Sequence, residues 1–344
     1  MDLRKQTMRL LDAIGVSGYE AEASAVAADI IKPFADEVVI DGIYNVAAYK
    51  RSKVPGAKTV LLDAHIDQIG CKVSGFTKDG FVLIAPVNCP DDILPGSEVV
   101  IQTASGNIRG VCGYLPPVYE PDRDHKAVRP GFDRLFIDTG LTEEEARAKI
   151  AVGDSVAFGN GAAELADGSI ICRSSDDRIC YMSIVHAMEL VRDEDLAVNV
   201  IAVGSVKEEF DGSGAFARAW ADRPDIVVAV DVADRTPLGE GPIITVGGDC
   251  DRKLGDEMVA LAKREKIPYT FRMVPEVSGT NAKHYQIAVT GAKVCGISHP
   301  QKYMHTSVEM ISLQDTENIG KLIAAFLRSF GTQTSEPADR EGAV

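Results

Sequence analysis

The chain has 344 residues, of which 45% are hydrophobic and 25% charged, a balance typical of a soluble globular protein with one large domain or two smaller ones. Its net charge of −15 argues against nucleic acid as a partner, because phosphates need a basic surface. No apolar run approaches the roughly 20 residues of a membrane span, no secretory signal is visible, and seven cysteines without CxxC spacing indicate reduced thiols, so we expect a cytoplasmic protein.

Hydrophobic spacing predicts helices and strands near the N-terminus. Residues 3–14 and 20–34 are expected to be helices, separated by a short glycine-containing gap. The segment VVIDGIYNVAAYK at 38–50 alternates like one strand, and KTVLLDAHID at 58–67 is an apolar strand that ends in charge. This pattern is the start of an α/β domain.

The pattern changes from about residue 73. Short β-type runs, interrupted by Gly, Asp and Pro, occupy roughly residues 74–165, and KDG at 78–80 and SGN at 105–107 predict hairpin turns. Thr142, followed three residues later by Glu145, forms a capping box that opens a short helix. We expect this segment to be a small inserted β domain.

Helical and strand patterns alternate again after the insert. The helical patterns are SSDDRICYMSIVHAMELVRD, SGAFARAWADR and LGDEMVALAKREK, and the strand patterns are VNVIAVGSV and DIVVAVDVA. Such alternation implies a mostly parallel sheet with helices on both faces. The predicted fold is therefore an α/β domain formed by residues 1–73 and 166–344, interrupted by a β domain at 74–165.

Charged side chains follow the predicted strands, and parallel sheets place their chemistry at the carboxyl ends of strands. His65 and Asp67 share one face of the first long strand, Glu208 and Glu209 end the next, and Asp231 follows five apolar residues. A metal-bound imidazole commonly donates its other N–H to a carboxylate, as the His65 and Asp67 spacing allows. The same pair is equally compatible with a packed histidine beside a surface acid.

Two further groups complete the set. Asp176 and Asp177 begin a predicted helix, where an acid is also a common N-cap, and His305 lies near the last helical segment. Two histidines with several carboxylates suit zinc, cobalt or manganese, and they are too many for one tetrahedral ion. They suit two ions about 3.5–4 Å apart. The pattern predicts that one glutamate of the adjacent pair binds a metal and the other takes a proton from water.

The motifs that carry these residues match one known family in order and spacing. They are HID at 65–67, DDR at 176–178, EE at 208–209, DV at 231–232 and YMHTSVE at 303–309. The chain resembles the dinuclear metallo-aminopeptidases that assemble as tetrahedral particles, the TET aminopeptidases of metallopeptidase family 42, which also carry the labels glutamyl aminopeptidase and endoglucanase. The resemblance extends over essentially the whole chain.

The resemblance implies a ligand set. One ion would be held by His65, Asp176 and Asp231, and the other by Asp176, Glu209 and His305, so that Asp176 bridges the two. Two divalent ions per chain are implied, with zinc favoured over cobalt or manganese.

The resemblance also implies the remaining roles. Glu208 would be the general base that returns its proton to the leaving amine, Asp67 would orient His65, and the peptide bond between Asp176 and Asp177 would be cis. The implied fold is a catalytic domain with an inserted β-barrel dimerisation domain. The implied substrates are peptides, cleaved at their N-terminus, and the implied assembly is a homo-oligomer of dimers forming a tetrahedral dodecamer.

Four positions depart from the family pattern. Gln68 and Asn281 stand where Glu and Asp are usual, Lys302 where Arg is common, and Val118 where His is common. None is a predicted metal ligand. The departures bear on substrate preference or assembly and leave the predicted hydrolysis intact.

Two other functions remain as alternatives. A non-catalytic peptide-binding or assembly protein on the same scaffold would be expected to lack ligands or the base, and all are present here. A glycoside hydrolase needs two carboxylates around a sugar, and it is disfavoured because the chain has one Trp and 6% aromatic residues.

The remaining histidines and acids give weaker signals. Asp122, Asp124 and His125 could bind a cation but are more typical of a solvated loop. His284 and His299 lie closer in sequence to the predicted site and are candidate substrate contacts, whereas His186, inside a predicted helix, is expected to be a packing or surface residue.

Overall fold

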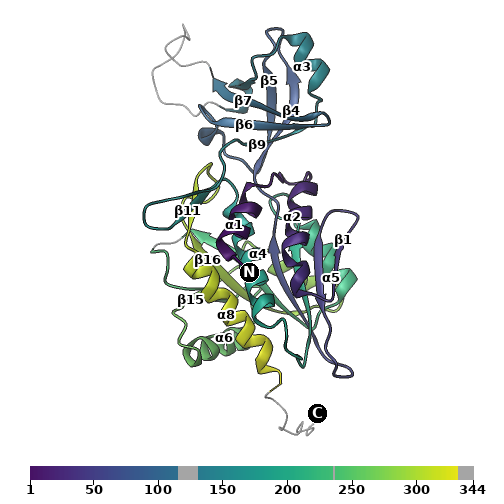
Figure 1. The fold of residues 1–344 in the computed structure, drawn as a ribbon, viewed down its shortest axis with the longest axis vertical. Helices are drawn as coiled ribbons and strands as arrows, with labels where there is room; N and C mark the ends of the chain where they lie inside the picture. Colours follow the sequence, from purple (N-terminus) through teal and green to yellow (C-terminus); the bar gives the residue numbers. More distant parts are fainter. Residues whose placement is uncertain (115–130, 235–236, 332–344) are drawn as a thin grey trace.

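The structure is a computed structural model that describes residues 1–114, 131–234 and 237–331. It forms an elongated molecule with a β-barrel at one end and a larger α/β domain below it (Figure 1). The α/β domain contains both the N-terminal helices and the last helix, so the barrel is an insertion. This architecture confirms the predicted fold class, while the division of the chain at residues 74 and 165 stays a prediction.

The α/β domain is built on an eight-stranded mixed sheet. In spatial order its strands are β1 (Glu37–Ile40), β2 (Val46–Lys50), β12 (Asn199–Ser205), β3 (Thr59–His65), β13 (Ile226–Asp234), β16 (Lys293–Gln301), β14 (Ile243–Val246) and β15 (Thr270–Met273). The four central strands, β12, β3, β13 and β16, run parallel. Their apolar runs are buried on both faces, and their carboxyl ends meet at one edge.

One predicted element was wrong. The segment expected as a single strand over 38–50 forms β1 and β2, which pair antiparallel. The turn between them is closed by Asp41, whose carboxylate accepts hydrogen bonds from the backbone N–H groups of Ile43 and Asn45. The alternating pattern continues across the turn, so periodicity alone does not reveal it.

Helices cover both faces of the sheet. One face packs against α1 (Leu3–Asp12), α2 (Ala21–Ile31), α4 (Ser175–Leu190), α6 (Arg252–Arg264) and α8 (Leu313–Ser329). The other face packs against α5 (Ser213–Asp222) and α7 (Ala282–Ile287). Helix α4 is buried along nearly its whole length between the sheet and α8, which fixes the acidic residues at its first turn relative to the strand ends.

The inserted domain is a closed six-stranded antiparallel barrel. Its strands are β4 (Gly70–Phe76), β5 (Val82–Val87), β8 (Leu135–Asp138), β7 (Gly106–Tyr114), β6 (Glu98–Thr103) and β9 (Ser155–Phe158). Both predicted hairpins are present, as β4–β5 and β6–β7. The Thr142 and Glu145 capping box opens α3 (Glu143–Lys149) as predicted.

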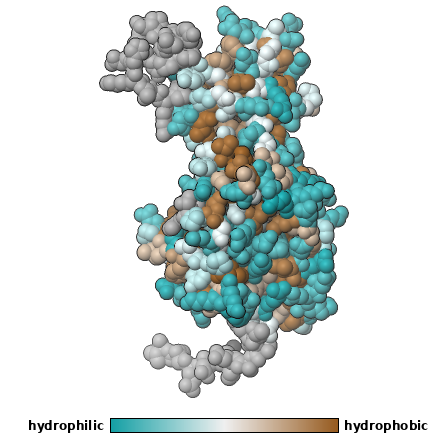
Figure 2. All heavy atoms as spheres, turned by 60° about the vertical axis from the view of Figure 1, so that its left-hand side comes forward, coloured by the Kyte–Doolittle hydropathy of each residue, from teal (hydrophilic) through white to brown (hydrophobic). Residues whose placement is uncertain are grey.

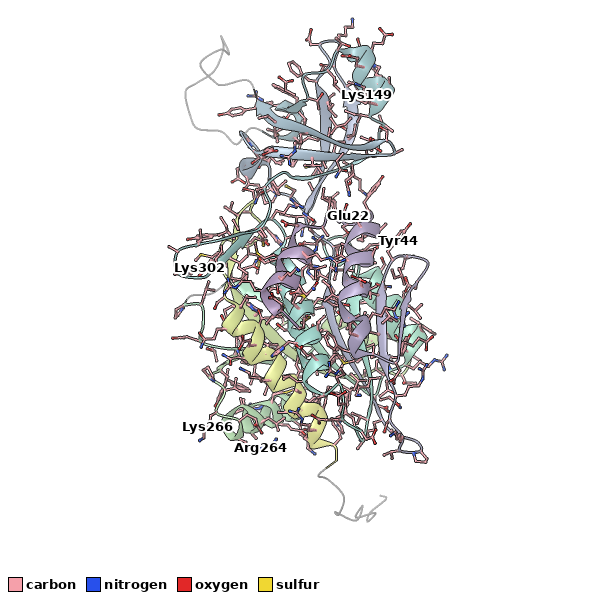
Figure 3. The ribbon with its side chains drawn as sticks, in the orientation of Figure 1. Glu22, Tyr44, Lys149, Arg264, Lys266 and Lys302 are labelled. Carbon is pink, nitrogen blue, oxygen red and sulfur yellow. The ribbon has the colours of Figure 1, made fainter. Side chains whose placement is uncertain are left out.

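The barrel is seated on the α/β domain by polar contacts. Gln102 of the barrel donates a hydrogen bond to Glu22, which lies at the end of α2 nearest the barrel (Figure 3). Tyr19 donates to the backbone carbonyl of Gly153. On the face shown in Figure 2, hydrophobic side chains gather at the narrow waist between the two domains, while the larger domain is mostly hydrophilic.

A small three-stranded sheet joins segments that are far apart in sequence. It consists of β10 (Ala163–Glu164), β11 (Ile170–Cys172) and β17 (Glu309–Ile311). It brings the segment after His305 beside the start of α4. Lys302, one of the departures from the family pattern, pairs through its backbone with Met310 at this side of the domain (Figure 3). Among the described residues, no helix combines the length and apolar character that crossing a membrane requires.

Arg178 is fully buried beneath the strand ends without a carboxylate partner among the described residues. Its guanidinium donates to the backbone carbonyls of Ile66 and Leu10, at 2.9 and 3.2 Å, and to the side-chain oxygen of Gln68 at 3.0 Å. Burial lowers the pKa of Arg178 to about 10. The side-chain nitrogen of Gln68 is buried without a partner.

We expect Gln68→Glu to stabilise the protein by about 1–2 kcal/mol, because a charge-assisted hydrogen bond would replace a neutral one and the orphaned amide nitrogen would disappear. Urea unfolding at pH 7.5, with the exposed Gln286→Glu as the matched control, measures this. A lower free energy of unfolding for Gln68→Glu than for wild type would contradict the account of Arg178.

Candidate metal centre

The predicted site residues come together where the central strands end. His65 is the last residue of β3, Asp231 lies near the end of β13, and Glu208 and Glu209 follow β12. With Asp176 and His305 they line one cavity of about 350 Å³. The structure thus places all five predicted ligands and the predicted base in a single cavity.

Asp176 occupies the centre of this group. Its Oδ1 lies 3.1 Å from Nε2 of His65, and its Oδ2 lies 3.2 Å from Nε2 of His305. His305 Nε2 is also 3.5 Å from Oε1 of Glu209. Each carboxylate oxygen of Asp176 therefore faces a different histidine, which is the arrangement that a shared ligand between two ions requires.

Asp67 organises the turn that carries the two glutamates. Its Oδ1 accepts a hydrogen bond from the backbone N–H of Glu208, and its Oδ2 accepts one from the backbone N–H of Glu209, both at 3.1 Å. Oδ1 also lies 3.4 Å from Nδ1 of His65. Lys207, which precedes the pair, adopts a left-handed conformation with φ 61°. One buried acid thus connects the imidazole to both glutamates.

The first turn of α4 supplies a second acid. The peptide bond between Asp176 and Asp177 is cis, as the resemblance implies. Oδ2 of Asp177 accepts from the backbone N–H of His65 at 3.2 Å, and its Oδ1 is buried without a partner. His65, Asp177 and Asp231 also offer ligand atoms that lie within 4.8 Å of one another, as do His65, Asp176 and Glu209. Asp177, to which no metal role was given, is therefore part of the same acidic cluster.

The electrostatics of the cluster favour bound cations. Burial raises the pKa of Asp231 well above its ordinary value, and burial with the neighbouring Asp176 raises that of Glu209. Hydrogen bonds to Asp176 and Glu209 raise the pKa of His305 to about 11. Burial alone would lower the pKa of His65, but its contacts with Asp176, Asp67 and Glu208 raise it well above its usual range. A cavity that draws protons onto both histidines is one that attracts positive charge.

The donor set fits divalent metal ions. Oε1 of Glu209 and Oδ1 of Asp177 are buried without a hydrogen-bond partner within the described chain. Unpaired buried polar atoms are costly, and imidazole nitrogens with carboxylate oxygens are the ligands of zinc, cobalt and manganese. Ions in the cavity would satisfy these groups and neutralise the adjacent acids.

Glu208 lies at the edge of the cluster. Its Oε2 is 3.9 Å from Nε2 of His65, and its side chain keeps 18% of its exposure, more than Asp176 or Glu209. Burial raises its pKa to about 7, opposed by His65 and reinforced by Glu209 and Asp67. A carboxylate in this position can reach a reacting water while remaining accessible from the cavity.

Sequence reasoning missed two contacts at the site. Asn88, in the loop after β5 of the barrel, donates a hydrogen bond to Oε2 of Glu209 at 2.6 Å. Glu309 is buried, and its two oxygens accept from the backbone N–H groups of His305 and Asp176, at 3.1 and 3.0 Å. Glu309 is part of the YMHTSVE motif, so a role for it at the site could have been predicted from the sequence. No pattern in the sequence indicates that Asn88 contacts Glu209.

The weaker candidates lie elsewhere. His299 is fully buried and bonded to Thr316 at 3.0 Å, so it is a packed histidine and makes no contact with the cavity. His284 packs against Gly212 and does not line the cavity. His186 packs against Gly320 of α8, which is the packing alternative of the two expected for it.

Of the departures from the family pattern, Asn281 lies in the described structure and Val118 does not. The amide nitrogen of Asn281 donates to the buried carboxylate of Asp63 and to the hydroxyl of Ser205, both at 3.0 Å, below the site. The loop with Asp122, Asp124 and His125, and the departure at Val118, lie outside the described residues.

Comparison with known proteins decides the family. The model of the M42 glutamyl aminopeptidase family matches residues 45–322. The chain belongs to this family. It is accordingly an aminopeptidase, a peptide hydrolase of a metallopeptidase family, which confirms the resemblance drawn from the motifs.

Individual relatives of this M42 chain match over nearly their whole length. A lysyl aminopeptidase from Pyrococcus furiosus is 29% identical over 93% of this chain and 95% of its own. The crystal structure of a TET aminopeptidase from the Thaumarchaeota archaeon SCGC AB-539-E09 superposes with a TM-score of 0.89, at 25% identity over 95% of this chain and 96% of that one. The TET1 peptidase of Pyrococcus horikoshii, which can assemble into a tetrahedron or a large octahedral shell, has a TM-score of 0.84 at 27% identity, over 95% of this chain and 99% of that one.

Proposed function

We infer that this chain is a two-metal aminopeptidase that hydrolyses the N-terminal peptide bond of its substrates. His65, Asp176 and Asp231 would hold one divalent ion, and Asp176, Glu209 and His305 the other. The observation that carries this proposal is the Asp176 carboxylate, whose two oxygens lie 3.1 and 3.2 Å from the Nε2 atoms of two different histidines. When bound, the two ions would lower the pKa of a reacting water and polarise the scissile carbonyl.

The chain's own residues supply the proton transfers and the geometry. Glu208 would take a proton from the attacking water and return it to the leaving amine, which needs a carboxylate at the cavity edge within reach of both. Asp67 would fix the imidazole of His65 and, through the backbone N–H groups it binds, hold Glu208 and Glu209 in place. Glu309 would hold the backbone at Asp176 and His305, and Asn88 would orient Glu209.

Assembly into dimers, and of dimers into a tetrahedral dodecamer, is the quaternary structure that the proposal includes. The TET1 relative can assemble into a tetrahedron or a large octahedral shell, and its structural similarity extends over 95% of this chain. Exposed apolar side chains at the waist between the domains are the kind of surface that an interface covers (Figure 2). Enclosure would limit substrates to peptides that can enter the particle.

The test is hydrolysis of a panel of aminoacyl-p-nitroanilides by protein loaded with zinc, cobalt or manganese, with metal content measured in parallel. We expect cleavage that a chelator abolishes and that re-addition of one of the three metals restores. A well-folded protein that binds two ions and cleaves none of the panel, nor any short peptide, would instead favour the non-catalytic peptide-binding function. Turnover of a cellulose oligomer that survives chelation would favour the glycoside hydrolase.

A further inference from the structure

One wall of the cavity is a short loop to which the two-metal mechanism gives no role. Ser278, Gly279 and Thr280 line the cavity together with the predicted metal ligands. These residues, 278–280, are called the wall loop below. The wall loop lies between β15 and α7, and it belongs to the SGTNA segment in which Asn281 departs from the family pattern.

A buried acid behind the cavity holds the wall loop. Asp249 lies between β14 and α6, is 2% exposed and is not among the residues that line the cavity. Its Oδ1 accepts a hydrogen bond from the backbone N–H of Ser278 at 3.0 Å, and its Oδ2 accepts one from the Ser278 hydroxyl at 2.8 Å. Both oxygens of this carboxylate therefore bind the same residue of the wall loop.

These bonds also fix the direction of a chain of hydroxyl groups. An ionised carboxylate accepts hydrogen bonds and donates none, so the one hydroxyl proton of Ser278 is used for Asp249. Oγ of Ser278 lies 2.8 Å from Oγ1 of Thr280, and Thr280 must therefore be the donor in that pair. Oγ1 of Thr280 in turn accepts from the backbone N–H of Ala282, at the start of α7, at 3.2 Å. Asp249 thus determines the orientation of a hydroxyl group that lines the cavity.

The turn that carries Asp249 packs directly against the chain that leads into the wall loop. Gly247 and Gly248 have φ values of 93° and 54°, which favour glycine. A Cβ on Gly247 would overlap the carbonyl oxygen of Val274, and one on Gly248 would overlap that of Glu276. Backbone contacts backbone at both positions, so the turn and its acid are fixed relative to the loop.

The wall loop has main-chain donors that the protein itself does not use. The backbone N–H groups of Gly279 and Thr280 have no hydrogen-bond acceptor in the described part of the chain. Gly279 is exposed, and a Cβ built on it would meet no atom within 4 Å. Backbone N–H groups are strong donors that need an acceptor, and the carbonyl group of a bound peptide is the acceptor that this cavity would receive.

We propose that the wall loop binds main-chain carbonyl groups of the peptide substrate, and that Asp249 is a positioning residue that holds the loop through Ser278. The inference rests on the proposed function, because the peptide must enter the cavity in which its bond is cleaved. Every peptide presents the same main-chain carbonyl groups. Loss of the Asp249 contact should therefore weaken the binding of all peptide substrates alike, whatever their N-terminal side chain.

The experiment compares the wild type with Asp249→Asn, Ser278→Ala and the double variant. Asp256→Asn on α6 is the matched control, because it makes the same change in an exposed ion pair with Arg252. Hydrolysis of Leu-Gly-Gly, Ala-Gly-Gly and Lys-Gly-Gly is measured together with metal content. The same substitutions are also made in Glu208→Gln and titrated calorimetrically with Leu-Gly-Gly, which measures binding without turnover.

We expect Asp249→Asn to raise KM about 5- to 50-fold for all three peptides and to leave kcat within about threefold, because the lost contact acts equally on bound substrate and transition state. The asparagine amide would place a donor against a donor of Ser278. Ser278→Ala removes only the hydroxyl contact and should raise KM less. In the double variant the two effects should be less than additive, since both substitutions act on one contact. The calorimetric affinities should follow KM, and Asp256→Asn should match the wild type.

The outcomes distinguish this inference from the proposed function. An unchanged KM in both single variants, with cleavage intact, overturns the role of Asp249 and leaves the aminopeptidase standing. An increase in KM for only one of the three peptides overturns main-chain recognition, because the loop would then recognise a side chain. Loss of bound metal in Ser278→Ala as well as in Asp249→Asn also overturns the inference, since the contact would then support the metal centre.

If the wild type cleaves no peptide, the proposed function fails and the wild type itself is titrated with Leu-Gly-Gly. Weaker binding by Asp249→Asn and Ser278→Ala than by the wild type and Asp256→Asn would then still support the wall loop as a peptide-binding site. Equal binding by all four proteins would overturn it.

Discussion

Replacing Glu208 by Gln should lower kcat by about 100- to 10,000-fold while leaving two metal ions bound per chain, which is the range that removal of a general base produces. The amide has nearly the same shape but cannot accept a proton at neutral pH. The substitution leaves the surrounding structure intact, because Asp67 is bonded to the backbone N–H of Glu208 and makes no hydrogen bond with its side chain. Steady-state kinetics with parallel elemental analysis measure both quantities.

The exposed Glu144→Gln on α3 of the barrel is the matched control and should retain full activity. Loss of metal in Glu208→Gln would show that Glu208 is a ligand and that the roles of the two adjacent glutamates are exchanged. Unchanged kcat would show that another group accepts the proton. Either result would assign the role of general base to a residue other than Glu208.

Asp176→Asn should have the second large effect, because one substitution removes the acid between both histidines. The neutral amide would place a hydrogen-bond donor where one of the two ions needs an electron pair, and it would remove the negative charge that both ions share, with His65 and His305 on either side. We expect metal content to fall from two ions to fewer than one per chain, and kcat/KM to fall by about a thousandfold or more, corresponding to the several kcal/mol that metal ions contribute. Mass spectrometry of metals on gel-filtered protein measures the first quantity.

The exposed Asp193→Asn, on the loop after α4, serves as the control and should keep both ions. Circular dichroism of the Asp176 variant tests whether it is folded. If Asp176→Asn retained two ions at wild-type affinity, the bridge between the two sites would be wrong. The nearby Asp177, with its unpaired Oδ1, would then be the stronger candidate.

Most residues of the candidate site could be predicted from the sequence, because the carboxyl ends of parallel strands lie at the same edge of a sheet. An acid or histidine directly after a buried apolar run is therefore placed near its counterparts by topology alone, as with His65, Glu209 and Asp231. Asp176 needed more than this argument, since a helix N-cap is an equally good reason for an acid at that position.

The same local rules could not reveal the contacts that depend on packing between distant segments. Asn88 reaches Glu209 only because the barrel closes and then rests on the larger domain. Arg178 and Gln68 meet under the strand ends although they lie 110 residues apart in the sequence. The two strands over 38–50 were missed for a different reason, since hydrophobic alternation does not distinguish one long strand from a hairpin closed by Asp41.

The contact between Asn88 and Glu209 also limits how this protein could be rebuilt by recombination. The barrel is continuous in sequence and has its own apolar core, so it resembles a cassette that could be exchanged between relatives to alter assembly. A graft of the α/β domain onto a foreign barrel would, however, remove a hydrogen-bond donor from Glu209, a proposed metal ligand. The catalytic domain of this chain therefore depends on the loop after β5. A functional chimera with a foreign barrel would have to keep this loop, including Asn88.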